Sequence, residues 1–146
     1  MTAPHPEGDG AFRAMRAALD DANLSSGDVD YINAHGTATP HNDAAESAAI
    51  RRLLGDRAEK VPISSIKAMV GHTLGAAGAI EAVASVLTLA NGFIPPTVNL
   101  QTPDPAFGAM DFVPGAARAL HARVVLSNSF AFGGNNTSLA FVSATS

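Results

Sequence analysis

The sequence predicts an α/β domain built on a mixed sheet. Segments with apolar residues at helical spacing alternate along the chain with short runs of β-prone residues. The chain also ends in two strand-like runs that flank a glycine-bearing turn, which is typical of an antiparallel hairpin. No internal repeat interrupts this alternation, so we expect one fold unit.

The first two thirds of the chain contain the regular elements. In order, we expect a helix that ends near Asn23, a strand over 29–34, a helix over 43–54, a strand over 61–66 and a helix over 73–91. Phe12, Met15 and Leu19 form an apolar stripe with charged residues opposite, which indicates a helix that packs on one face. Gly55 and Pro95 are placed where they would end the second and third helices.

The last third is less regular. Residues 93–121 contain five prolines and show no clear period, and irregular segments of this length are usually functional or dock on a neighbour. Strands are expected over 123–126 and 138–142, on either side of the string SNSFAFGGNNTS.

The helix predicted over 73–90 has almost no polar face. Its only non-apolar, non-glycine residues are Thr73, Glu81, Ser85 and Thr88, and a helix that is apolar all round is normally buried all round. Only 15% of the residues are charged, against about 25% in typical domains. We therefore expect part of the surface to be covered by something outside these elements.

Composition also excludes several classes of function. The chain has no cysteine, which rules out disulfides, thiolate zinc sites and a cysteine nucleophile of its own. The net charge of −4 and the absence of a basic block argue against nucleic acid as a partner. The start has no basic or apolar leader, and the longest apolar stretch is interrupted by Glu81, so a soluble, cytoplasmic protein with no membrane contact is expected.

Three clusters that could carry chemistry follow predicted strands: His35 to Thr39, Lys67 with Gly71-His72, and Phe130 to Gly134. Side chains at strand ends and helix starts tend to converge on ligands. A position at a helix N-terminus favours the neutral imidazole of His72, which suits polarisation of a carbonyl group. For each of His35 and His72 a purely structural role is about as frequent as a functional one, and His5, His41 and His121 receive no role.

Glu81 is the strongest anomaly in the sequence. A carboxylate in a helix without a polar face is costly unless it is paired. It therefore requires a partner, such as Lys67, an asparagine or a bound metal ion.

Five strings carry a family resemblance: NAHGTATPHNDAAE, SSIKAMVGHTLGAAGAIE, PPTVNL, DFVPG and SNSFAFGGNN. In this order they resemble the C-terminal half of β-ketoacyl-acyl-carrier-protein synthases, most closely the type II condensing enzymes of fatty acid synthesis. The resemblance covers essentially the whole chain. It implies that residues 1–146 are one half of the layered αβαβα thiolase-like fold, and that the half bearing the cysteine nucleophile is absent.

The same resemblance assigns roles to the clusters. His35 and His72 would be the two histidines of a Cys-His-His site, and Lys67 would support them electrostatically, through water or through Glu46. Thr37 and Thr39 match hydroxyls that hold the phosphopantetheine arm. Phe132 matches the phenylalanine that gates the active site in this family. Gly133 and Gly134 match the residues whose backbone N–H groups form half of an oxyanion hole. A structural monovalent cation would be held by Asn33, Glu46, Glu81, Ser127 and Asn128.

The implied reaction is the decarboxylative Claisen condensation of an acyl thioester with malonyl-acyl-carrier protein, in fatty acid or polyketide synthesis. No cofactor is required beyond the phosphopantetheine of the acyl-carrier protein. That carrier and the cysteine-bearing half would be the partners, within an enzyme that is dimeric when complete. Ala131 and Asn135 depart from the family pattern, which leaves the acyl length open. The alternative is a non-catalytic chain-length factor, a scaffold subunit or an inactive fragment, but the intact histidine motifs favour the condensing enzyme.

Overall fold

The computed structural model describes residues 3–144 and contains a four-stranded sheet. Its order is β2 (Ile63–Ser64), β1 (Tyr31–Asn33), β5 (Val124–Ala131) and β6 (Asn135–Val142). Strand β1 runs parallel to β2 and β5, whereas β6 is antiparallel to β5. The predicted α/β class with a mixed sheet is therefore confirmed.

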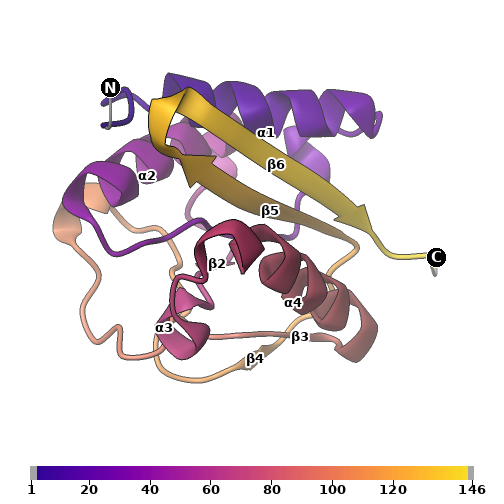
Figure 1. The fold of residues 1–146 in the computed structure, drawn as a ribbon. Coiled ribbons are helices and arrows are strands. Elements are labelled where there is room, and N and C mark those ends of the chain that lie inside the picture. The colour runs from indigo at the N-terminus through magenta and orange to yellow at the C-terminus, as the bar shows by residue number, and fades with distance from the viewer. Residues whose placement is uncertain (1–2, 145–146) are drawn as a thin grey trace.

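Helices cover both faces of this sheet (Figure 1). On one face lie α1 (Asp9–Asp21) and α2 (Pro40–Leu54), and α4 (Ala77–Asn91) lies on the other. Alternation along the strands sorts the core accordingly, because successive side chains point to opposite faces. Ile32 and Leu126 belong to the cluster beneath α1 and α2, whereas Tyr31 and Val125 belong to a second, smaller cluster.

The helix boundaries follow local chemistry. Helix α1 buries Met15 and Leu19 from the predicted apolar stripe. Helix α2 begins at Pro40, which fits the first turn because its missing N–H would be unpaired there. It ends at Leu54 and is capped by Gly55, which has a φ of 56°. The strand expected over 61–66 is only two residues long. The four-residue helix α3 (Lys67–Val70) begins directly after the predicted segment, and its N-cap, Ile66, is the last residue of that segment.

The hairpin differs from the expected one. Strands β5 and β6 are eight residues each, and only Phe132–Gly134 forms the turn between them. The polar residues that flank the turn in sequence are part of the strands: Asn128 pairs with Ser138, and their side chains are hydrogen-bonded to each other. Polarity alone therefore misplaced the ends of both strands.

Residues 93–121 are mostly irregular, as predicted. They contain only the two-residue strands β3 (Phe93–Ile94) and β4 (Arg118–Ala119), which pair antiparallel, and one short turn of helix. Buried side chains tie this stretch to the sheet: the hydroxyl of Ser64 donates to the carbonyl of Pro95 at 2.7 Å and accepts from the Tyr31 hydroxyl at 2.7 Å.

Helix α4 buries polar residues and exposes apolar ones, which is the reverse of an ordinary surface helix. Its buried residues include Glu81, Ser85 and Thr88, which face the sheet. Val83, Val86 and Leu87 are 50–60% exposed, and we call these three the α4 outer face. Nothing in the described residues covers that face, which agrees with the expectation that its cover comes from outside these elements.

Residues Leu74–Asn91 also meet the length and composition of a membrane-spanning helix, with a mean hydropathy of 1.4 over 18 residues. Those criteria do not consider how polar residues are distributed around the helix. The inward face of this segment carries a buried ion pair with the rest of the protein, which is described below.

Candidate active site

The histidines of the first two clusters meet at one edge of the sheet. His35 lies two residues beyond the end of β1, and His72 follows α3 after Gly71. Their ring centroids are 5.5 Å apart and the rings are nearly perpendicular, at 83°. The expected proximity is confirmed, since both imidazoles lie close enough to reach one small ligand atom.

His35 is buried and is held through its backbone. The carboxylate of Glu46 accepts the N–H groups of His35 and Gly36, each at 2.9 Å, so one α2 side chain fixes the turn after β1. Burial lowers the pKa of the His35 imidazole to about 4, with smaller contributions from the charges of Lys67 and His72. At neutral pH His35 is therefore an uncharged imidazole. Its Nδ1 is buried without a hydrogen-bond partner among the described residues.

His72 is exposed, and its ring is oriented by the next turn. The N–H of Leu74 donates to Nδ1 of His72 at 3.2 Å. Because Nδ1 accepts this bond, the proton of the neutral ring lies on Nε2, which makes Nε2 a hydrogen-bond donor. The regular helix begins only at Ala77, so His72 lies further from the helix N-terminus than the sequence suggested.

Lys67 and Glu81 form an ion pair that is buried on both sides. The Nζ of Lys67 donates to Oε1 of Glu81, and the two side chains are only 6% and 2% exposed. This pair accounts for the Glu81 anomaly. It also corrects the expected route from Lys67 to the histidines, because Lys67 pairs with Glu81 and not with Glu46. Helix α2, which carries Glu46, lies on the opposite face of the sheet from α4.

The third cluster spans the end of β5 and the turn between β5 and β6. Phe132 is 77% exposed, and Gly133 and Gly134 both have positive φ, at 79° and 81°. The ring of Phe130, one of the residues in this cluster, lies 5.9 Å from the ring of His35. The turn therefore belongs to the same edge as the histidines. Thr37 and Thr39 lie in the loop before α2, and their hydroxyls are 3.0 Å apart.

The five residues expected to hold a cation separate into two groups. Ser127 and Asn128 are neighbours in β5, so their side chains point to opposite faces of the sheet. Asn33 contacts the Glu81 carbonyl and the Ser127 hydroxyl, at 3.3 and 3.4 Å. Asn128 instead donates to Glu46 at 3.2 Å. The group around Asn33 has an oxygen free to bind a cation, because Oδ1 of Asn33 is buried without a partner among the described residues. Oδ1 of Asn128, in the other group, accepts a hydrogen bond from Ser138.

Sequence reasoning overlooked two contributors to this edge. Ser65 links the turn after His35 to the start of α3, through bonds from its hydroxyl to Gly36 and from the Lys67 N–H. Asn42 donates to Glu46 at 3.3 Å. Both lie inside the quoted strings, but serine and asparagine at such positions carry no periodic signal. Only the tertiary contacts single them out.

Comparison with known proteins identifies the chain. Residues 1–101 match the family described as "Beta-ketoacyl synthase, C-terminal domain". The chain belongs to this family. A curated relative, 3-oxoacyl-[acyl-carrier-protein] synthase 2 of Synechocystis, is 53% identical over 141 residues, which are 97% of this chain and 34% of the relative. The chain thus spans about a third of the length of the curated β-ketoacyl synthases it matches.

Solved ketosynthase structures confirm the thiolase-like fold. The ishigamide ketosynthase/chain length factor aligns with a TM-score of 0.91 and 44% identity, over 97% of this chain and 34% of that one. A type II polyketide ketosynthase in complex with its acyl-carrier protein aligns with a TM-score of 0.94 and 38% identity, over 99% of this chain and 35% of that one. The fold expected from the family resemblance is therefore the observed one.

Proposed function

We propose that this chain supplies the two histidines of a Cys-His-His condensing site, and that a cysteine-bearing half supplies the nucleophile. The observation that carries the proposal is the His35–His72 pair, with centroids 5.5 Å apart and His35 held neutral. A neutral His35 with His72 at this separation suits hydrogen bonding to one oxygen on which negative charge develops. A cysteine must come from elsewhere, because this chain contains none.

The reaction begins with malonyl-acyl-carrier protein bound beside an acyl group on that cysteine. The bond from the malonyl carboxylate carbon to the methylene carbon breaks, CO₂ leaves, and the electron pair passes into an enolate on the thioester. His72 donates from Nε2 to the enolate oxygen, and His35 lies against the same oxygen. The enolate carbon then attacks the acyl carbonyl carbon, a carbon–carbon bond forms, and the carbon–sulfur bond breaks to return the thiolate.

The remaining residues support these steps. Lys67 lies close enough to lower the pKa of His35, so its ammonium group helps to keep that ring neutral. In this proposal Thr37 and Thr39 hold the phosphopantetheine arm of the acyl-carrier protein. The N–H groups of the Phe132–Gly134 turn complete an oxyanion hole for the acyl carbonyl, and Phe132 is the gate over it. A monovalent cation fits beside Asn33, Ser127 and the backbone carbonyl of Glu81, where it would coordinate the unpartnered Oδ1 of Asn33.

The α4 outer face supports the proposed partner. Val83, Val86 and Leu87 are exposed over a helix that buries its polar residues, and Met69, Val70, Leu74 and Phe93 extend the same apolar character on neighbouring segments. Contiguous apolar surface of this kind marks an interface. About two thirds of the length of the curated relatives lies outside this chain, and we assign the cover of this face to that portion. A cytoplasmic enzyme, dimeric when complete, is part of the same proposal.

A non-catalytic subunit is the competing function. Solved structures that this chain resembles include a ketosynthase/chain length factor assembly. A chain-length factor or scaffold has no need of two imidazoles at one carbonyl site, so the histidine pair favours the condensing enzyme.

The test uses the chain assembled with a cysteine-bearing ketosynthase half. His35→Ala and His72→Ala should each slow malonyl decarboxylation about 10²–10³-fold, because each removes a donor to the developing oxyanion. Loading of the acyl group on the cysteine should be much less affected.

His121→Ala is the matched control, because His121 is exposed and has no role in the site. It should leave both steps unchanged. Equal loss of loading and decarboxylation in the His35 and His72 variants would instead indicate a structural role for these histidines, and a wild-type assembly without decarboxylation would indicate the non-catalytic subunit.

A further inference from the structure

We infer that Ser65 is a positioning residue that sets the distance between the His35 turn and the helix that carries Lys67. This inference rests on the proposed function and deepens it. Ser65 lies between β2 and α3 and is 7% exposed. One hydroxyl group in this place contacts both segments of the site.

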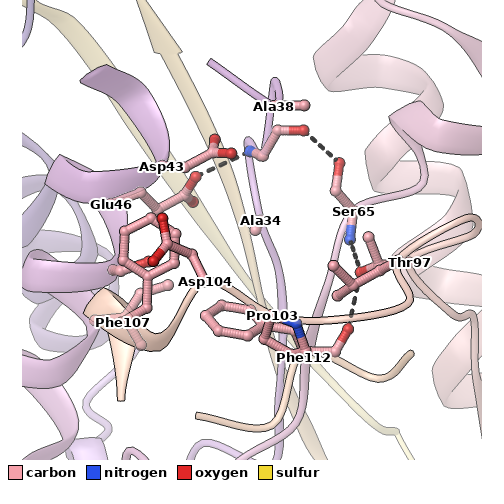
Figure 2. A pocket seen from close by; sticks show the side chains of 14 residues that line it. Ala34, Ala38, Asp43, Glu46, Ser65, Thr97, Pro103, Asp104, Phe107 and Phe112 are labelled. Carbon is pink, nitrogen blue, oxygen red and sulfur yellow. Dashed lines mark hydrogen bonds between the residues drawn. The ribbon is translucent and has the colours of Figure 1, made fainter. Parts of the chain in front are cut away.

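The first contact is with the turn that follows β1. The Ser65 hydroxyl donates to the carbonyl of Gly36 at 2.9 Å (Figure 2). The two residues are packed closely: a Cβ atom built on Gly36 would lie 2.6 Å from the Cβ of Ser65. Gly36 has a φ of 41°, so its backbone takes a conformation that other residues rarely adopt. The turn that carries His35 is therefore fitted against this one side chain.

The second contact is with the start of α3. The same hydroxyl oxygen accepts the backbone N–H of Lys67 at 3.3 Å. That N–H belongs to the first residue of the helix, where it has no partner within the helix itself. Ser65 therefore caps the segment that carries the lysine while it holds the carbonyl that follows His35.

The position of Ser65 is itself fixed from the far side. Its backbone N–H donates to Oγ1 of Thr97 at 3.3 Å, and Thr97 donates to the carbonyl of Phe112 at 2.9 Å. Figure 2 shows this chain of bonds beside a pocket of about 180 Å³ that Gly36, Ser65 and Thr97 all line. The irregular segment from 93 to 121 thus braces Ser65 and, through it, the histidine turn.

Glu46 fixes only one side of this arrangement. Its carboxylate holds the N–H groups of His35 and Gly36 from the α2 face. Among the described residues Glu46 has no hydrogen bond to α3, whereas Ser65 accepts the N–H of Lys67. The distance from His35 to Lys67, and so the influence of the lysine on the histidine, depends on Ser65.

The test compares two neighbouring serines in the assembled condensing enzyme. Ser65→Ala removes the bonds to Gly36 and Lys67. Ser64→Ala is the matched control, because Ser64 is also buried and also donates one bond and accepts one, to Pro95 and from Tyr31. Both variants should lower the thermal transition temperature to a similar extent.

Only Ser65→Ala should affect decarboxylation. We expect its kcat to fall roughly 10- to 100-fold, since a displacement of about 1 Å in a catalytic group costs up to that much. The KM for malonyl-acyl-carrier protein and the rate of acyl loading should change little. Ser65→Thr, which keeps the hydroxyl, should recover most of the rate. If Ser65→Ala does not assemble, Ser65→Cys takes its place, with a weaker donor and a smaller loss.

A crystal structure of the Ser65→Ala assembly gives a readout that does not depend on activity. The Gly36 carbonyl should move away from the α3 start by more than about 0.5 Å, the tolerance of a catalytic arrangement. Unchanged coordinates, or equal kinetic losses in the Ser64 and Ser65 variants, would overturn the inference. A wild-type assembly that fails to decarboxylate malonyl would overturn the proposed function instead, while the crystal structure would still decide the role of Ser65.

Discussion

Removal of one partner from the Lys67–Glu81 pair should destabilise the assembled protein strongly. Both side chains are almost completely buried, at 6% and 2% exposure, so each charge depends on the other for its stabilisation. Lys67→Met leaves the Glu81 carboxylate buried and unpaired, which costs about 3–5 kcal/mol in comparable pairs. With a denaturant dependence of about 2 kcal/mol per molar urea, a loss of 4 kcal/mol moves the unfolding midpoint down by about 2 M.

The double variant Lys67→Met with Glu81→Leu separates stability from function. It removes both charges and replaces them with apolar groups of similar size, so its midpoint should return to the wild-type value or exceed it. Its decarboxylation rate should stay low, because the positive charge near His35 is gone. Urea unfolding followed by circular dichroism and a decarboxylation assay on the same samples measure both quantities.

The exposed pair Arg16–Asp20 is the matched control. Its side chains are 52% and 61% exposed, and its nitrogen–oxygen distance is 3.0 Å. Arg16→Met should cost less than about 1 kcal/mol, because solvent screens such a pair. The reasoning is refuted if Lys67→Met costs no more than Arg16→Met, or if the double variant is as unstable as the single one.

Three further predictions concern other parts of the chain. Without its partner half, the chain should self-associate, bind a hydrophobic dye and form no 3-ketoacyl product. Leu87→Glu should reduce both the self-association and the assembly with the partner half. A well-behaved wild-type monomer would contradict the role of the α4 outer face. Gly36→Ala should cost about 1–3 kcal/mol or more from positive φ and contact with Ser65, whereas Gly75→Ala, with open space and no positive φ, should cost little in the same unfolding assay. His35 should titrate near pH 4 in an NMR titration. The free energy of unfolding should therefore fall as the pH drops from about 6.5 to about 4, because the histidine of the unfolded chain takes up a proton in this range and folded His35 does not. A His35 pKa at its ordinary value would refute the burial argument.

The sequence by itself determined the class of fold and most of the elements. Apolar spacing placed α1, α2 and α4 correctly, because helical periodicity is a local property of the chain. It misjudged the strands at their ends. Strand β2 is shorter than predicted because α3 begins close behind it, and β5 and β6 are longer because polar residues there form cross-strand bonds. Strand limits depend on partners that lie far away in sequence.

The candidate site divides in the same way. Ordered motifs were enough to single out His35, His72 and Lys67 and to recognise the family, since each motif is contiguous in the chain. Tertiary structure alone decided that Lys67 pairs with Glu81, that Asn128 faces away from Ser127, and that Ser65 joins two segments of the site. Those facts depend on which sheet face each side chain occupies and on the packing of α4 against it. A burial pattern in which Glu81 points inward and Leu87 outward exists only once the helix has a sheet on one side.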